Sequence, residues 1–205
     1  MLVTFENVSK KYNREIIFKN LSYVFKTGQS YAITGPNGSG KSTLLQVISG
    51  FVRQSSGDVA YELHGKPLEV EDLYKHLSIA TPYLELVEEF TLMEMINFHF
   101  KFKKPALQPE EILSRAYLTD ARDKQIKKFS SGMKQRLKLA LTLFTDSSLI
   151  LLDEPTSNLD EQGTEWYKEQ ISSLISDDKT IIIASNQKYE YDFCDEVIDI
   201  IKYKS

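Results

Sequence analysis

The chain of 205 residues has little cysteine and no long apolar run, and both absences narrow its possible classes. Its one cysteine, Cys194, excludes an internal disulfide and a metal cluster held by thiolates, which fits a reducing compartment. We interpret Cys194 as a small, half-buried residue. The longest apolar runs, such as 148–152 and 181–184, have the length of a strand and fall short of the roughly 18–20 residues that cross a bilayer.

The chain also lacks a strong excess of charge of either sign. The 29 Asp and Glu against 25 Lys and Arg give a net charge of −4, which argues against broad nucleic-acid binding, because such surfaces are strongly basic. The first residues include Glu6 and no basic stretch, so we expect no secretory signal. These observations predict a soluble globular protein. If it works at a membrane, we expect another chain to hold it there.

The pattern of apolar residues predicts strands early in the chain and an alternation of strands and helices later. The predicted strands are 3–8, 21–25, 29–34, 58–63, 77–80, 149–152, 180–184 and 197–201. The predicted helices are 41–49, 91–102, one that opens at Pro109, 131–144 and 160–175. The late alternation favours a parallel α/β sheet. We interpret 83–128 as a small helical subdomain, in which Phe98, Phe100 and Phe102 form core or a partner surface.

A glycine-rich loop follows the predicted strand 29–34 and opens the helix 41–49. It matches G-x-x-x-x-G-K-[ST] and reads Gly35, Pro36, Asn37, Gly38, Ser39, Gly40, Lys41 and Ser42, with Thr43 next. Glycines let backbone N–H groups turn toward a phosphate, and a helix N-terminus adds positive potential. Lys41 can reach the β- and γ-phosphates, and the Ser42 hydroxyl can bind Mg²⁺. The loop predicts a site for Mg·ATP, with residues 35–43 as its binding residues.

Two acids follow the fully apolar strand 149–152. A buried parallel strand delivers its last residues to the carboxyl edge of the sheet, where ligands bind and where the glycine-rich loop must lie. Asp153 is therefore suited to hold Mg²⁺ together with Ser42, and Glu154 is suited to act as the general base for an attacking water.

Three further motifs, in the expected order, carry a resemblance to the nucleotide-binding subunits of ABC transporters. Residues 129–136, with the sequence FSSGMKQR, resemble the family's signature LSGGQxQR. Residues 157–160, SNLD, resemble its D-loop, and Lys11-Tyr12 resembles its aromatic A-loop. The resemblance covers essentially the whole chain. It implies one ABC ATPase domain over 1–205: a P-loop parallel sheet, an N-terminal antiparallel β subdomain and the inserted helical subdomain.

The resemblance also implies partners and further nucleotide contacts. Ser130 and Gly132 would complete the ATP pocket of a second ABC subunit, in a head-to-tail homodimer or heterodimer. Tyr12 would stack on adenine, although it can also be read as a surface tyrosine in a hairpin, and Asp160 of the D-loop joins the nucleotide contacts. An integral membrane permease would hold the protein at the cytoplasmic face of the membrane.

Two positions depart from the family pattern. Asn186 stands where the family has a switch histidine; an amide can donate a hydrogen bond to a γ-phosphate but cannot shuttle a proton near pH 7. Pro82 stands near the expected Q-loop glutamine, and no glutamine occurs between Gln54 and Gln108, so coupling must use another residue, with Glu85 as a candidate. We still predict catalysis by Glu154 and Asn186, at a slow rate.

The sequence therefore predicts an ATPase that drives a membrane transporter, of exporter type. Two alternatives stay open. One is an ABC ATPase that acts on ribosomes or DNA, which the single cassette without sustained heptads disfavours. The other is a subunit that binds ATP and relies on a partner cassette for turnover. The transported substrate is not encoded in this chain.

Overall fold

Two β-sheets organise the protein, and the computed structural model describes residues 1–176 and 178–204. The antiparallel sheet has the order β2-β1-β4-β5 and consists of β1 (Leu2–Tyr12), β2 (Glu15–Phe25), β4 (Ser56–Leu63) and β5 (Lys66–Leu68). The parallel sheet has the order β6-β7-β8-β3-β9 and consists of β3 (Ser30–Thr34), β6 (Leu77–Ala80), β7 (Leu149–Asp153), β8 (Thr180–Ala184) and β9 (Glu196–Asp199). The predicted fold class is confirmed.

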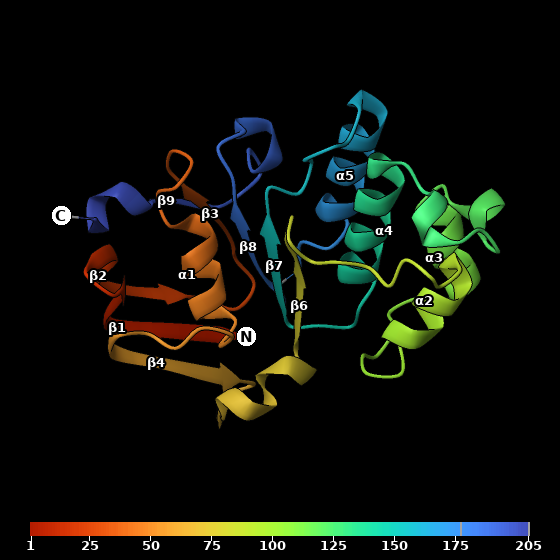
Figure 1. Ribbon diagram of the computed structural model, residues 1–205. Helices are drawn as coiled ribbons and strands as arrows, with labels where there is room; N and C mark the ends of the chain where they lie inside the picture. Colours follow the sequence, from red (N-terminus) through yellow and green to blue (C-terminus); the bar gives the residue numbers. More distant parts are fainter. Residues whose placement is uncertain (177, 205) are drawn as a thin grey trace.

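Five α-helices in the described ranges surround the parallel sheet. They are α1 (Lys41–Ile48), α2 (Leu92–His99), α3 (Pro109–Arg115), α4 (Ser131–Leu143) and α5 (Glu161–Ser172). Short 3₁₀ turns lie at η1 (Val70–Lys75), η2 (Thr119–Ala121), η3 (Ile126–Lys128), η4 (Lys188–Glu190) and η5 (Ile200–Tyr203). In Figure 1, α1 lies between the two sheets, α4 and α5 cover the other side of the parallel sheet, and α2 and α3 lie farthest out. No helix in the described ranges has the length and apolarity to cross a bilayer.

The central strand β7 explains why the sheet needs helices on both sides. Its residues are all buried, and they alternate between two cores: Leu149 and Leu151 pack in the cluster around α1, whereas Ile150 and Leu152 pack in the cluster around α4. Successive side chains of a strand point to opposite faces, so a fully apolar strand must be covered on both. The continuous apolar run of the sequence therefore encodes the layered arrangement.

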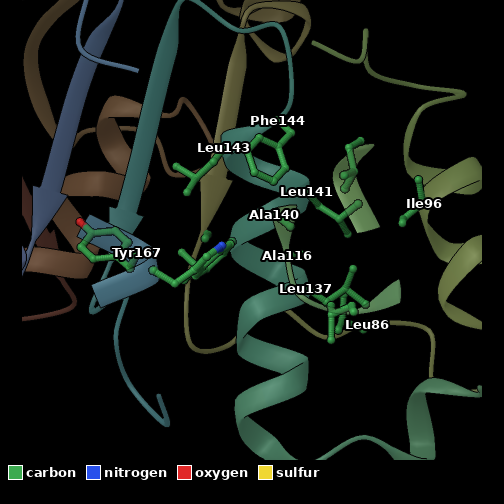
Figure 2. Close-up of a cluster of buried hydrophobic side chains, with 14 of the residues drawn as sticks. Leu86, Ile96, Ala116, Leu137, Ala140, Leu141, Leu143, Phe144 and Tyr167 are labelled. Atoms are coloured by element: carbon green, nitrogen blue, oxygen red, sulfur yellow. The ribbon is translucent and has the colours of Figure 1, made fainter. Parts of the chain in front are cut away.

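The cluster around α4 joins the outer helices to the sheet. Figure 2 shows Leu137, Ala140 and Leu141 on α4 in the middle of this core, with Ile96 of α2 on one side and Tyr167 of α5 on the other. All five side chains are at most 4% exposed. One continuous core therefore links α2 to α4, which begins within residues 129–136, and to α5.

Three predicted elements end two or three residues earlier than the sequence indicates. The helix predicted over 91–102 ends at His99. Phe98 and Phe102 are exposed, with their ring centroids 5.3 Å apart, while Phe100 packs partly against the core. The helix predicted over 160–175 begins after its N-cap Asp160 and ends at Ser172. The strand predicted over 197–201 ends at Asp199, whose carboxylate accepts a hydrogen bond from the N–H of Ile201 at 3.0 Å and starts the turn η5.

Candidate nucleotide site

Three neighbouring strands deliver the candidate site residues to one edge of the parallel sheet. Ala184 at the end of β8 pairs with Ile33 of β3 on one side and with Asp153 of β7 on the other. The pairing continues one residue further, since the N–H of Glu154 donates to the carbonyl of Ala184 at 2.9 Å and that of Ser185 donates to the carbonyl of Ile33 at 3.1 Å. The loops after β3, β7 and β8 therefore begin at the same level.

The loop after β3 has a shape that only glycine permits at two positions. Gly35 has φ 144° and Gly40 has φ 103°, in the left-handed region where a Cβ is strained. A Cβ on Gly35 would lie 2.8 Å from the Ser39 Oγ, and one on Gly40 would lie 2.4 Å from the Cγ2 of Ile17 in β2. Both positions require glycine because the loop is packed tightly against its own turn and against the antiparallel sheet.

Lys41 and the start of α1 make this loop an anion cradle. The Lys41 side chain is buried, and its ammonium donates to the carbonyls of Gly35 at 2.9 Å and Pro36 at 3.4 Å. Helix α1 begins after Gly40, which has no side chain to cap it, so its first N–H groups stay available to a ligand. The buried Ser39 hydroxyl also has no hydrogen-bond partner among the described residues. An anion such as phosphate fits these unpaired donors.

A cavity of about 380 Å³ lies against this loop and reaches the general-base candidate. It is lined by Ile17, residues 37–43, Tyr83 and Glu154. Two of these residues, Ile17 and Tyr83, are not predicted as site residues from the sequence. Ile17 lies in β2, which begins six residues before the predicted strand 21–25. Tyr83 follows Pro82, in the segment where a glutamine was expected, and this exposed tyrosine lines the cavity.

Asp153 lies buried at the end of β7, next to the loop. Burial is the largest cause that raises its pKa above the ordinary 3.8, and a hydrogen bond with Ser42 opposes this effect. The charge of Glu154 raises the pKa further, and that of Lys41 lowers it. No group of three or more His, Cys, Asp or Glu side chains in the described part of the chain is arranged to hold a metal. Ser42 and Asp153 fit Mg²⁺ instead in the usual manner, in which phosphate oxygens and water complete the ligands.

Glu154 has an unusual backbone conformation. Its φ of 45° is in the left-handed region, which a glutamate adopts only when its surroundings hold it there. The backbone hydrogen bonds of Glu154 N–H to Ala184 and of Ser157 N–H to the Glu154 carbonyl, at 3.1 Å, provide that restraint. Its side chain lines the cavity at the glycine-rich loop and a second cavity of about 240 Å³, so that it lies between them.

Asn186 contacts the glycine-rich loop directly. Its Nδ2 donates to the Oδ1 of Asn37 at 2.8 Å, and both residues line the second cavity with Glu154. The structure therefore brings together Asn37, Glu154 and Asn186, which lie far apart in the sequence. This contact links the loop after β8 to the loop after β3.

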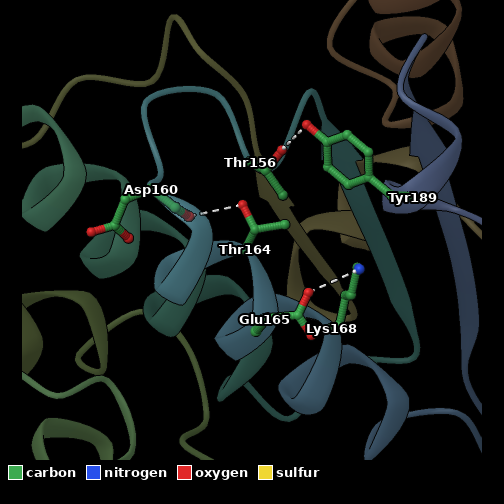
Figure 3. A network of polar contacts seen from close by, with 6 residues as sticks. All are labelled: Thr156, Asp160, Thr164, Glu165, Lys168 and Tyr189. Atoms are coloured by element: carbon green, nitrogen blue, oxygen red, sulfur yellow. Dashed lines mark hydrogen bonds and ion pairs between the residues drawn. The ribbon is translucent and has the colours of Figure 1, made fainter.

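The second cavity also contains a buried acid that the sequence analysis missed. Glu190 is 1% exposed and accepts hydrogen bonds from the N–H of Thr156 at 2.8 Å and from the hydroxyls of Thr156 and Ser185. Figure 3 shows the Thr156 hydroxyl next to the ring of Tyr189, with the two oxygens 3.4 Å apart. Nothing in the local sequence distinguishes Glu190 from a surface glutamate, because its partners come from another part of the chain.

The remaining candidate residues lie outside these two cavities. Ser130 is the N-cap of α4 and accepts from the N–H of Met133 at 3.2 Å, and Gly132 approaches the carbonyl of Asn158 so closely that a Cβ would lie 3.2 Å from it. Asp160 caps α5 by accepting from the N–H of Gly163 at 2.8 Å. The signature and the D-loop therefore lie against each other within one chain.

Tyr12 ends β1 at the hairpin to β2, where it pairs with Glu15. Its ring is 45% exposed, and the ammonium of Lys10 lies 4.6 Å from the ring centroid. An exposed tyrosine in a hairpin agrees with both interpretations of this residue, as a ring that stacks on adenine and as an ordinary surface tyrosine. The stacking of Tyr12 on adenine therefore stays a prediction.

The fold and the loop geometry define the class: the chain is a P-loop nucleotide-binding protein with a parallel sheet. Comparison with known proteins extends this result. Residues 18–157 match the ABC transporter family model. The chain is 31% identical over 202 residues to the lantibiotic transport ATP-binding protein SrtF of Streptococcus pyogenes, covering 98% of this chain and 86% of that protein. It is 29% identical to the Nod factor export ATP-binding protein I of Burkholderia orbicola, covering 95% of this chain and 66% of that protein.

A solved structure agrees with these relatives. The dimeric structure of a bacterial ABC transporter cassette has a TM-score of 0.82 and 25% sequence identity, covering 97% of this chain and 94% of the other. The chain belongs to the ABC transporter family and is an ATP-binding protein of that family. The resemblance drawn from the motifs is confirmed.

Proposed function

We propose that this chain binds Mg·ATP and hydrolyses it as the energy-coupling subunit of a membrane transporter of exporter type. One observation carries the proposal: the loops after β3, β7 and β8 meet at one sheet edge, where Asn186 binds Asn37 of the phosphate loop and Glu154 lies between two adjoining cavities. This arrangement supports the proposal, because phosphoryl transfer needs phosphate-binding, metal-binding and base groups at one site.

Binding of the triphosphate uses groups that are already in place. The N–H groups of the loop and of the first turn of α1 surround the phosphates, and the ammonium of Lys41 exchanges its contacts with loop carbonyls for contacts with phosphate oxygens. Ser42 and Asp153 would hold Mg²⁺, which would neutralise negative charge on the phosphates. Little rearrangement is needed, because the loop glycines fix the cradle before the nucleotide arrives.

Glu154 then acts on water. Its carboxylate orients a water molecule for in-line attack on the γ-phosphorus and accepts the proton that the water loses, while the bond to the β-phosphate oxygen breaks. Asn186 donates a hydrogen bond to the γ-phosphate from the opposite loop. Asn186 can position the γ-phosphate as a histidine would, but it cannot take up or release a proton, because an amide keeps the same protonation state across neutral pH.

A second subunit completes the site. Ser130 is exposed at the N-terminus of α4 and lies outside the cavities of its own chain, which agrees with a role toward the nucleotide of a partner. We place Gly132 and Asp160 at the same interface, and we place Tyr12 against adenine. The structure of the related cassette, at 25% identity, is dimeric.

We further propose that residues 83–128 form an inserted helical subdomain that transmits the change to a permease. A mostly apolar cavity of about 210 Å³ lies between α2 and the core, and the exposed rings of Phe51 and Tyr74 border it. A permease segment on this groove would hold the protein at the cytoplasmic side of the membrane. The relatives named for lantibiotic transport and Nod factor export support transport, and the second supports export.

Asn186 provides a prediction for hydrolysis. We expect Asn186→Ala to lower the turnover number by about 5-fold or more, since the lost hydrogen bond contributes about 0.5–1.5 kcal/mol. Steady-state ATPase rates at saturating ATP measure the effect, with the exposed neighbour Gln187→Ala as the control for the loop. A turnover number equal to that of the wild type would reduce Asn186 to a structural contact with Asn37.

Asp153 provides a prediction for pH. Because its pKa is raised and Mg²⁺ binds the ionised carboxylate, protons compete with the metal at a higher pH than for an ordinary Asp. We expect the Mg²⁺ concentration for half-maximal thermal stabilisation by ATP to rise as the pH is lowered from 7 toward 5. Asp153→Asn should weaken the stabilisation and make this dependence shallower, leaving the part that comes from protonation of ATP itself, whereas exposed Asp58→Asn should leave the dependence unchanged. A wild-type curve that is flat over this range contradicts the assignment of Asp153.

Two measurements test the function as a whole. The first is Mg²⁺-dependent release of phosphate from ATP by the purified chain, alone and with the membrane protein that co-purifies with it. The second is the identity of that co-purifying protein. A polytopic membrane protein supports the transporter assignment. Ribosomes or DNA instead would overturn it, and nucleotide binding without turnover in any complex would leave an ATP-gated subunit.

A further inference from the structure

A fully buried carboxylate connects the two loops that deliver Glu154 and Asn186. We propose that Glu190 is a positioning residue of the hydrolytic site, which holds these two loops at a fixed spacing so that Glu154 and Asn186 act on the same γ-phosphate. The inference rests on the proposed ATPase function. Glu190 lies at the wall of the second cavity, and we assign it a role that acts through its neighbours.

The first half of the connection is the loop after β7. The N–H and the hydroxyl of Thr156 both donate to the same carboxylate oxygen of Glu190, the N–H at 2.8 Å. Thr156 follows Glu154 by two residues, and Glu154 has the strained left-handed φ of 45°. On its other side the same loop is held by Gln135 of α4, whose Nε2 donates to the carbonyl of Pro155 at 2.7 Å. Glu190 and Gln135 therefore clamp the segment directly after the general base.

The second half is the loop after β8. The hydroxyl of Ser185 donates to the other carboxylate oxygen of Glu190 and accepts from the N–H of Gln187 at 2.8 Å. These two contacts flank Asn186, whose own side chain reaches Asn37 at 2.8 Å. The orientation of Asn186 toward the phosphate loop thus depends on a turn that Glu190 holds.

The position of Glu190 itself is fixed from a third element. Its carbonyl accepts from the buried hydroxyl of Tyr167 on α5 at 3.0 Å, and its N–H donates to the carbonyl of Gln187 at 2.9 Å. In the described ranges no Lys, Arg or His forms a salt bridge with it. A buried carboxylate without a cation is unfavourable unless hydrogen bonds satisfy it. The Glu190 carboxylate accepts three, two from Thr156 and one from Ser185, and this arrangement indicates that it positions the two loops.

The test compares two substitutions of Glu190. Glu190→Gln keeps an oxygen for Thr156 and offers an amide N–H to the Ser185 oxygen, so the spacing survives without the charge. Glu190→Ala removes the connection. We expect Glu190→Ala to lower the turnover number by about 10-fold, because misplacement of reacting groups by a fraction of an ångström is costly to rate, and to leave the KM for ATP within about 2-fold. Glu190→Gln should stay within about 3-fold of the wild type, and exposed Glu169→Ala should equal it.

A double variant identifies the route. If Glu190 acts through Asn186, the rate losses of Glu190→Ala and Asn186→Ala are not multiplicative, and the double variant is at least about 3-fold faster than their product predicts. Should Glu190→Ala not fold, Ser185→Ala carries the same comparison with Asn186→Ala. A turnover number unchanged in Glu190→Ala, or strictly multiplicative losses, overturns the inference alone. If ATP turnover by the wild-type protein does not depend on Glu154, the proposed function is overturned, and this inference is overturned with it.

Discussion

Replacing Glu154 with Gln is expected to lower ATP turnover by about 10²–10⁴-fold while nucleotide binding is retained, since a general base commonly contributes that much. The amide has nearly the shape of the carboxylate but cannot take a proton from water. The backbone of Glu154 should stay in place, because its hydrogen bonds to Ala184 and Ser157 use main-chain atoms only. The loss should therefore fall on the turnover number and not on ATP affinity.

The measurement is phosphate release at saturating Mg·ATP, paired with the shift in melting temperature that ATP produces. Exposed Glu161→Gln, in the first turn of α5, is the matched control. A second readout is the oligomeric state: ATP that persists between subunits should keep Glu154→Gln dimeric for longer than the wild type. Equal turnover in Glu154→Gln and wild type would mean that this subunit does not itself catalyse hydrolysis, which leaves the partner-dependent alternative.

Lys41→Ala should have the largest effect on binding. Charged hydrogen bonds contribute about 1.5–3 kcal/mol each, so their loss is expected to weaken ATP affinity by about 10- to 100-fold. The stabilisation that saturating ATP gives the wild type, about 2.7 kcal/mol at one hundred times the Kd, should then fall to about 0.4–1.4 kcal/mol at the same ATP concentration. Turnover should fall with it, because the same ammonium balances charge on the transferred phosphate.

Calorimetric titration with ATP and thermal unfolding with and without nucleotide measure this prediction. Lys204→Ala is an informative control: its ammonium donates to the carbonyl of Gly38 at 3.3 Å, yet it comes from the exposed C-terminal turn. It should change ATP affinity by less than about 2-fold, as surface substitutions usually do little. Unchanged affinity and turnover in Lys41→Ala would show that the loop is not the working site.

Two parts of this protein can be predicted from short segments of its sequence: the glycine-rich loop and the buried strand β7. The phosphate loop is encoded by residues within eight positions of one another, because glycines at Gly35 and Gly40 determine a backbone shape by what they allow. The apolar run that becomes β7 predicts a doubly covered strand, because a strand that is apolar on both faces has no other stable place. The identities of Lys41, Ser42, Asp153 and Glu154 follow from these two segments.

Element ends and helix caps were harder to predict. The strand expected over 197–201 stops at Asp199, whose carboxylate starts the turn η5, and Ile200 then lies beside Gly35 and Gly40, at a sequence separation that no local pattern reports. Tyr83 shows the same limit. The absence of glutamine near Pro82 was visible in the sequence, but only the folded chain shows that the neighbouring tyrosine lines the cavity.

The sequence by itself determined the phosphate loop, the acid pair and the family, because each depends on residues adjacent in the chain. Only the tertiary structure decided that Asn186 binds Asn37 and that Glu190 joins Thr156 to Ser185. The physical reason is the order of the parallel sheet. It places β8 between β3 and β7, so residues 34 to 149 positions apart come side by side, and side-chain hydrogen bonds between them have no signature along the chain.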